Sequence, residues 1–385
     1  MCKKMRTFVA QMSKYSLLLL FAVLFTTGCR EQKKEPVTTP WGTVLHDTVE
    51  VSEDFDLAEI QGAGELIMAT VSGPLTCYDY HGRQLGIQYL LCQRLASRLG
   101  VSLRVDLCRD SAEVAAKLEA GDVDIAAWPT PGRLEVNKDK PLLNKELKMW
   151  YSDSVMAAVK KDEAFILSSR SVRRRVFSPM LDKHGGIISH YDQFFIQYAR
   201  PIRWDWRLLA AQCYQESTFD PKATSWAGAR GLMQIMPGTA DHLGLPRSQM
   251  YDPEQNISAA TRYLAELERT FSDIGDRQER TNFVLGAYNG GAHHIRDAMA
   301  LCQRDGHNAR HWREVEPYIL RLAQPQYYND PLVKHGYMRG SETVDYVRKI
   351  RQRHQGYLGV KTPHLGVQTG RHPRRSAARK QKYDL

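Results

Sequence analysis

The feature that most constrains the fold is an alternation of strand and helix patterns in the first half of the chain. In order, the patterns predict a buried strand over 66–71, a helix over 87–99 that Gly100 ends, a half-buried strand over 101–107, a short helix from Ser111 closed by Gly121, and a strand over 123–127. Strands that alternate with helices in this order favour a parallel sheet flanked by helices. We therefore expect the first folded part to be an α/β domain.

From Ser189 onward the pattern becomes helical throughout. Asp205 can cap a helix that begins at Trp206, and Asp252-Pro253 can open another. The apolar residues of that second helix fall at helical spacing: Ile257, Ala260, Leu264 and Leu267. The sequence thus predicts a second, mainly α-helical domain, and 385 residues are enough for about two to three domains.

One acidic residue stands at the end of an apolar stripe in the helical part. Trp206, Leu209, Cys213 and Glu216 fall on one face of the helix that Asp205 caps. Burial favours the protonated form of an acid, and a protonated carboxyl is what a general acid requires. The alternative is a surface glutamate at a frayed helix end, and periodicity alone does not decide between the two.

Four sequence blocks then follow one another: QESTFDP (215–221), SWAGARGLMQIMP (225–237), AYNGG (287–291) and ETVDYV (342–347). In this order and spacing they resemble the lysozyme-like catalytic domain of the soluble and membrane-bound lytic murein transglycosylases. The resemblance implies that Glu216 is the catalytic acid. It also implies a set of substrate-contacting residues: Ser217, Ser225, Gln234, Met236, Tyr288, Asn289, Glu342 and Tyr346.

Several of these residues also have structural interpretations. Asn289-Gly290-Gly291 reads as a helix stop, Glu342 can sit in the first turn of a helix capped by Ser341, and Tyr346 can pack in a core. Gly228, Ala229 and Gly231 are small enough to let the backbone approach a sugar, and the amide of Gln234 can bond its polar groups.

The resemblance implies cleavage of the β-1,4 bond between N-acetylmuramic acid and N-acetylglucosamine, with closure of a 1,6-anhydro ring and without water. Glycosidases usually need two acids, but a single one suffices if the substrate's own C6 hydroxyl is the nucleophile. The alternatives are a hydrolase similar to goose-type lysozyme and a non-catalytic lipoprotein that senses muropeptides. We expect no cofactor and no metal site.

The first domain resembles the first lobe of the periplasmic solute-binding proteins for amino acids, on Gly86-Ile87, Gly121-Asp122-Val123-Asp124 and Thr130-Pro131-x-Arg133. The resemblance implies that Arg133 clamps a ligand carboxylate. Leu90 replaces the family's acidic residue, and the second lobe is abbreviated to about 141–186. The domain is therefore expected to bind a small ligand or to act as a scaffold for a protein partner.

The N-terminus predicts export. A basic start, an apolar run over 17–25 that is too short to span a bilayer, and small residues before Cys29 indicate a signal peptide over 1–28. The position of Cys29 resembles a bacterial lipobox, which implies lipidation of Cys29 and a polar tether over 29–60. The arrangement of an α/β domain ahead of the helical one in a lipoprotein resembles that of the F-type membrane-bound lytic murein transglycosylases. The implied partners are glycan strands and a membrane, on the periplasmic side of a Gram-negative-type outer membrane.

The charge of the chain is concentrated at its ends. The net charge is +10, of which residues 1–28 contribute +4 and the last sixteen residues +5. The nearly neutral remainder argues against a nucleic-acid-binding protein. We accordingly expect an α/β domain over 61–186, a lysozyme-like domain over 187–360, and a disordered basic tail over 361–385.

Overall fold

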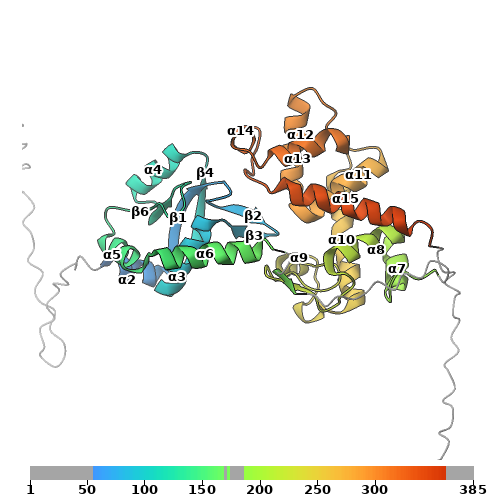
Figure 1. The fold of residues 1–385 in the computed structure, drawn as a ribbon, viewed down its shortest axis with the longest axis horizontal. Coiled ribbons are helices and arrows are strands. Elements are labelled where there is room, and N and C mark those ends of the chain that lie inside the picture. The colour runs from blue at the N-terminus through green and yellow to red at the C-terminus, as the bar shows by residue number, and fades with distance from the viewer. Residues whose placement is uncertain (1–54, 169–170, 174–185, 361–385) are drawn as a thin grey trace, which may run out of the picture. The chain divides into compact units, whose positions relative to one another are not determined.

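The computed structural model describes residues 55–168, 171–173 and 186–360 (Figure 1). The signal peptide, Cys29, residues 29–54 of the expected tether and the basic tail therefore lie outside the described residues. The tether prediction is wrong for its last residues, because 55–60 belong to a helix whose Ile60 is buried in the core of the α/β region. The described residues from Asp56 onward belong to one compact unit. Nowhere in the three described ranges is a helix both long enough and apolar enough to cross a membrane.

The α/β region is built on a four-stranded sheet. The central strand β1 pairs in parallel with β4 on one side and with β5 on the other, while β6 pairs antiparallel with β5. The β-α-β-α-β order predicted from the sequence is therefore confirmed. Across the sheet the strands are β4 (Ser102–Cys108), β1 (Glu65–Val71), β5 (Ile125–Ala127) and β6 (Leu134–Val136).

Helices cover both faces of this sheet. Leu66 and Met68 of β1 pack in one core with α3 and α5, whereas Ala69 faces a second core that α4 completes. The helices of this region are α2 (Phe55–Ala63), α3 (Ile87–Leu99), α4 (Ser111–Ala120), α5 (Pro141–Trp150) and α6 (Asp153–Ile166). The described residues of the expected second lobe form α5, α6 and a short strand over 172–173. The buried side chains of α5 and α6 pack in cores with residues of the first lobe, and the core of α6 also includes Tyr337 of the helical region. These described residues therefore do not form a separate second lobe.

The ends of α3 show why the sequence predicted this helix well. Its bounds match the prediction, and Gly100 caps it in the left-handed conformation with φ 78°. Glycine adopts that conformation without steric cost. The half-buried alternation expected next to it is wrong at Leu107, which is 50% exposed. The reason is that β4 is an edge strand with one neighbour only.

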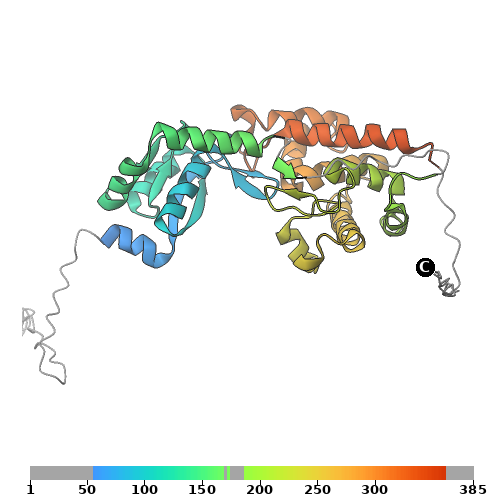
Figure 2. The ribbon, with the colours of Figure 1, turned by 60° about the horizontal axis from the view of Figure 1, so that its bottom comes forward.

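The helical region has one large hydrophobic core. Its central helix α8 packs against α7 and α15, and the long α15, red in Figures 1 and 2, also packs against α11 and α13. The helices are α7 (Asp192–Ala199), α8 (Trp206–Ser217), α9 (Pro237–His242), α10 (Pro253–Thr270), α11 (Arg277–Gly290), α12 (Ala292–Arg304), α13 (Trp312–Arg321), α14 (Pro325–Tyr328) and α15 (Gly340–Tyr357). The mainly α-helical structure predicted for this part of the chain is confirmed.

The described structure also contains two short two-stranded sheets. Strands β2 (Tyr78–Tyr80) and β3 (Arg83–Leu85) form an antiparallel hairpin in the α/β region. Strand β7 (Val172–Arg173), which follows α6, pairs antiparallel with β8 (Thr224–Ser225) of the helical region. Five cysteines of the described chain are free and buried, as expected for small hydrophobic side chains: Cys77, Cys92, Cys108, Cys213 and Cys302.

Candidate active site

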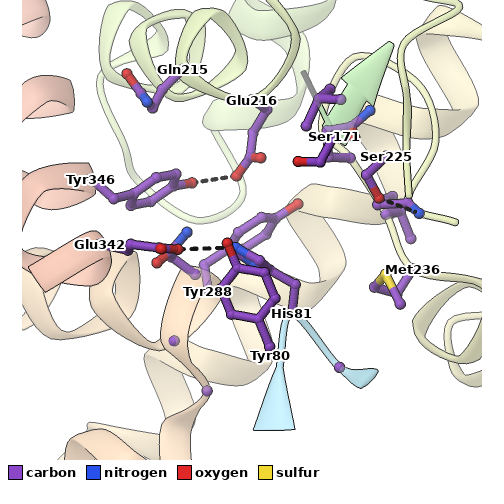
Figure 3. A pocket seen from close by; sticks show the side chains of 18 of the residues that line it. Tyr80, His81, Ser171, Gln215, Glu216, Ser225, Met236, Tyr288, Glu342 and Tyr346 are labelled. Atoms are coloured by element: carbon purple, nitrogen blue, oxygen red, sulfur yellow. Dashed lines mark hydrogen bonds and ion pairs between the residues drawn. The ribbon is translucent and has the colours of Figure 1, made fainter. Parts of the chain in front are cut away.

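A cavity of about 610 Å³ contains Glu216. Most of the residues that the four sequence blocks suggested line this cavity: Ser225, Gln234, Met236, Tyr288, Asn289, Glu342 and Tyr346. They come from α11, α15 and the loops around β8, so the fold brings together blocks that are far apart in the sequence. Figure 3 shows Glu216 facing Tyr346, with Tyr288 nearby.

Helix α8 places Glu216 at its last turn. The side chain of Asp205 accepts a hydrogen bond from the backbone N–H of Arg207, so the predicted cap is confirmed. Trp206, Leu209 and Cys213 are buried, and Glu216 at the end of their stripe is half-buried. The stripe therefore anchors the helix in the core and leaves the carboxyl at the cavity.

The chain turns sharply after Glu216. Thr218 and Phe219 both have positive φ, 54° and 62°, although neither is a glycine. Such backbone strain costs about 1–3 kcal/mol per residue and persists only where packing determines it. Here Phe219 is buried, and its ring contacts Tyr214 at 5.6 Å between centroids. The strained turn ends α8 directly behind Glu216 and thereby fixes where the carboxyl lies.

A hydrogen-bonded chain of side chains reaches Glu216 from the protein interior. The hydroxyl of Tyr346 donates to Oε1 of Glu216 over 2.5 Å, and Nε2 of Gln212 donates to that hydroxyl over 3.2 Å. Burial, followed by the charge of Glu216, raises the pKa of Tyr346 well above its usual range. Tyr346 therefore remains a neutral hydroxyl donor at all moderate pH values and holds the carboxyl in one orientation.

Tyr288 forms the wall on another side of Glu216. Its hydroxyl donates to the backbone carbonyl of Met233 over 2.8 Å, so this donor is already used within the protein. Burial, together with the nearby charge of Glu216, raises the pKa of Tyr288. The ring also leans on Tyr263 at 5.5 Å between centroids. Tyr288 thus offers the cavity an aromatic surface rather than a free hydroxyl.

Hydrogen bonds from Asn256 hold the loop over 225–236 in its conformation. This fully buried amide accepts from the backbone N–H of Met233 and donates to the carbonyls of Arg230 and Met250. Gly231, with φ 80°, lies so close that a Cβ there would be 2.4 Å from the carbonyl oxygen of Met250. The expectation that Gly231 gives room to a sugar is therefore wrong, because the missing side chain gives room to the protein itself.

The side chain of Gln234 is also hydrogen-bonded within the protein, which the sequence did not suggest. Its Nε2 donates to the carbonyls of Ala223 and Gly231, and its backbone has φ 48°. These bonds hold the side chain within its own loop, so its amide N–H groups are not available as the expected donors to substrate. Ser225 also has a local partner, because its Oγ accepts from the backbone N–H of Ala229 over 3.0 Å.

Ser217 is not at the cavity. It is fully buried, and its hydroxyl donates to the carbonyl of Cys213 within α8. The expected contact of Ser217 with substrate is not supported by this position. Asn289 does line the cavity, and its Oδ1 accepts from the hydroxyl of Thr343. The helix stop predicted there is confirmed at Gly291, although its φ of 86° and ψ of 136° differ from the expected left-handed helical conformation.

Glu342 lies in the first turn of α15, but Ser341 does not cap that helix, which begins at Gly340 without a side-chain cap. Arg339 donates from Nε to Glu342 over 2.8 Å. Burial acts to raise the pKa of Glu342, but polar contacts with His81 and Tyr80 and the charge of Arg339 hold it below its usual range. Glu342 is therefore an ionised, paired carboxylate.

Arg133 lies elsewhere in the chain and does not line this cavity. It is exposed, and its guanidinium lies over the ring of Trp128 at 5.4 Å. The buried amide of Gln88 fixes the loop that carries Arg133, because it donates to three carbonyls of this loop and accepts from the N–H of Gly132. The carboxylate clamp remains a prediction.

Sequence reasoning missed the part of the cavity wall that comes from outside the four blocks. Asp79, Tyr80, His81 and Gly82 of the β2–β3 hairpin line it, as do Ser171 and Val172 before the helical region. The backbone N–H of Trp226 donates to the carbonyl of Ser171 over 2.8 Å. His81-Gly82 is a recognisable turn in the sequence, but nothing local in a turn indicates what its tip will touch.

Comparisons with known proteins agree with the four blocks. Residues 193–310 match the family model described as Transglycosylase SLT domain. The chain is 39% identical over 175 residues to membrane-bound lytic murein transglycosylase F of Pseudomonas putida (strain F1), covering 46% of this chain and 35% of that one. It is 40% identical over 147 residues to the protein of that name from Desulfosudis oleivorans, covering 38% and 32%.

Among solved structures, the 70 kDa soluble lytic transglycosylase of Escherichia coli matches with 28% identity and a TM-score of 0.31, covering 43% of this chain and 24% of that one. The alignments with the F-type relatives span about a third of those proteins' length. The resemblance predicted from the sequence blocks is confirmed: the chain is similar to membrane-bound lytic murein transglycosylase F and contains a match to the SLT domain.

Proposed function

We propose that the chain is a peptidoglycan lytic transglycosylase that cleaves the bond between N-acetylmuramic acid and N-acetylglucosamine without water. The observation that carries the proposal is the placement of Glu216 at the end of α8, inside the cavity, with Tyr346 bonded to one carboxyl oxygen. The match of residues 193–310 and the similarity to the F-type relatives support the same chemistry.

Glu216 acts first as an acid and then as a base. In its protonated form it donates a proton to the glycosidic oxygen, and the bond from that oxygen to C1 of the muramic acid residue breaks. The C6 hydroxyl of the same sugar attacks C1, and the carboxylate of Glu216 takes the hydroxyl proton. The acid is thereby restored, a 1,6-anhydro ring closes, and the proximity of C6 to C1 replaces an external nucleophile.

The other carboxylates of the cavity support a mechanism with one acid. Asp79 accepts from the backbone N–H of Gly82, Glu342 from Arg339, and Asp345 from Arg348 over 2.5 Å. In the two-acid mechanisms the second carboxylate takes part directly as nucleophile or base. The family resemblance gives none of these three that role, so we propose the substrate's own hydroxyl as the nucleophile.

Mass spectrometry of digested peptidoglycan tests the proposal. We expect fragments one water lighter than hydrolytic ones, and we expect Glu216→Gln to lower their rate of release by about 10²–10⁴-fold, the usual contribution of a general acid. Glu119→Gln, which changes an exposed carboxylate on α4, is the matched control and should leave the rate unchanged.

The two alternative functions, a hydrolase and a muropeptide sensor, would give different results in the same assay. A hydrolase would release only fragments with hydrated reducing ends, which would refute the anhydro mechanism. A muropeptide sensor would release nothing, and Glu216→Gln would change no activity. Binding of glycan by the Glu216→Gln variant should persist, because the substitution keeps the size of the side chain.

We further propose that the chain works as a lipoprotein with glycan strands as substrate and a membrane as its support. Support comes from the sequence before and at Cys29 and from the relatives, whose name describes them as membrane-bound. For the α/β region we favour the role of a scaffold over that of a ligand receptor. The reason is that Gln88 locks the loop of Arg133 while the guanidinium rests on Trp128.

A further inference from the structure

The β2–β3 hairpin of the α/β region reaches the cavity of Glu216. Its residues Asp79 to Gly82 line that cavity, although they precede Glu216 by more than a hundred residues. Figure 3 shows Tyr80 and His81 between Glu342 on one side and Met236 on the other. The hairpin is therefore in a position to contact whatever glycan occupies the cavity.

The hairpin contacts the wall formed by the loop over 225–236. The ring of Tyr80 stacks on Trp226 with 6.1 Å between centroids and 17° between planes. At the tip, Gly82 faces Met236 closely enough that an added Cβ would lie 3.6 Å from the methyl carbon of Met236. The hairpin thus packs directly on residues of the 225–237 sequence block.

The hairpin also contacts the opposite wall at the start of α15. Nε2 of His81 lies 3.6 Å from Oε2 of Glu342, and the guanidinium of Arg339 lies 6.0 Å from the ring centre of Tyr80. Burial, then the charge and polar contact of Glu342, raises the pKa of Tyr80, so its hydroxyl stays neutral beside that carboxylate. Contacts on both walls mean that the hairpin bridges the cleft.

The hairpin is built as a rigid element. His81 and Gly82, with φ 51° and 70°, form a two-residue connection with positive φ at both positions, the type I′ geometry that matches the twist of paired strands. Asp79 accepts from the N–H of Gly82 and tightens the turn. At the base, a Cβ on Gly86 would lie 2.4 Å from the carbonyl oxygen of Thr76, so the backbone segments touch there.

A rigid bridge across a cleft limits how a polymer can enter it. A glycan strand that ran past both walls would have to displace the hairpin and its stacking on Trp226. The cleft is therefore closed on the side of the hairpin.

We propose that the β2–β3 hairpin is the end wall of the glycan cleft, so that the enzyme cuts at a fixed distance from one strand end and releases fragments of one short length. This inference rests on the proposed function, because it assigns the position of the cut to a transglycosylase. It makes Tyr80 and His81 specificity-determining residues contributed by the α/β region.

The test is a time course on long, peptide-free glycan strands with the full chain. We expect the wild type to release short fragments of one length from the start while the remaining strands stay long. The double variant Tyr80→Ala/His81→Ala removes the stacking and the contact with Glu342. It should raise the share of internal cuts about tenfold, which corresponds to about 1.4 kcal/mol.

Gln84→Ala is the matched control, because Gln84 is an exposed hairpin residue that does not line the cavity. It should keep the wild-type product lengths, and circular dichroism should show that all variants are folded. Strands labelled at one end provide a second measurement: the wild type should release label early from one labelled end only.

Three results separate the possibilities. Internal cuts by the wild type from the start would overturn the proposal that the hairpin is the end wall. Faster release by the double variant with unchanged fragment lengths would also overturn it and make the hairpin a lid. Short fragments of one length with hydrated ends would refute the anhydro chemistry and leave the end wall standing.

Discussion

The hydroxyl of Tyr346 donates a hydrogen bond of 2.5 Å to Glu216, which lies 130 residues earlier in the chain. Helix α15 thus completes a site that α8 begins, and the two helices pack directly on each other. The family model ends at residue 310, before this tyrosine, so the contact extends the site beyond the matched segment.

Tyr346→Phe should slow cleavage by about ten- to a hundredfold, because a hydrogen bond to a charged group is worth about 1.5–3 kcal/mol. The phenyl ring keeps the packing, but Nε2 of Gln212 loses its acceptor, so we expect a loss of stability beside the loss in kcat. The rate of anhydro-fragment release measures it. Tyr198→Phe, which removes a hydroxyl bonded to Glu254 outside the cavity, is the control. Equal rates for both variants would contradict the role given to Tyr346.

Asn256→Ala should lower the free energy of unfolding by about 2–4 kcal/mol, because it removes the partner of the buried N–H of Met233 and of the carbonyl of Met250, and one of the two donors to the carbonyl of Arg230. Urea denaturation followed by circular dichroism measures the change. Asn329→Ala, at an exposed position, should stay within about 0.5 kcal/mol of the wild type. A stability loss no larger than that of the control would mean that the loop over 225–236 does not depend on Asn256.

Acid should destabilise the protein partly through His294. Burial, together with the nearby His335 and His293, lowers the pKa of His294 to about 4. An unfolded histidine titrates near 6.5, so between these values the unfolded state binds more protons and stability falls as pH falls. At pH 5 the contribution lost is about 2 kcal/mol relative to neutral pH.

The difference in the free energy of unfolding between pH 7.5 and pH 5 checks this prediction. It should shrink by about that amount in His294→Gln and remain unchanged in His307→Gln, at an exposed site. The same acid sensitivity in the His294→Gln variant as in the wild type would assign the effect to other groups.

Cys29→Ser should abolish membrane attachment, because the lipobox resemblance assigns the lipid to Cys29. We expect the wild type to incorporate labelled palmitate and to partition into detergent, and the variant to do neither. Cys2→Ser changes a cysteine ahead of the expected cleavage site and should behave as the wild type does. A labelled Cys29→Ser variant would refute lipidation at this position.

Local signals made much of the fold predictable. Gly100 indicated the end of helix α3 and Asp205 the start of α8, and the spacing of apolar residues indicated the helices between such signals. The cavity side chains could be predicted only through the resemblance, because contacts between blocks such as Glu216 and Tyr346 have no local signature. Helix periodicity alone left Glu216 undecided.

What the sequence could not indicate depends on tertiary contacts. Whether the amide of Gln234 faces a sugar or its own loop depends on the positive φ at that residue, and whether Ser217 is exposed depends on how α8 packs. The hairpin tip at His81 was missed for the same reason, since its partner Glu342 lies far along the chain. Residue type and spacing do not encode these orientations.

The five buried thiols bear on the conditions in which the chain can work. Burial raises the pKa of every one of them: Cys77, Cys92, Cys108, Cys213 and Cys302. A protonated, enclosed thiol is a poor nucleophile and is hard for an oxidant to reach. Even Cys213, one turn before Glu216, should therefore stay reduced in an oxidising compartment, and alkylating reagents should leave the folded enzyme active.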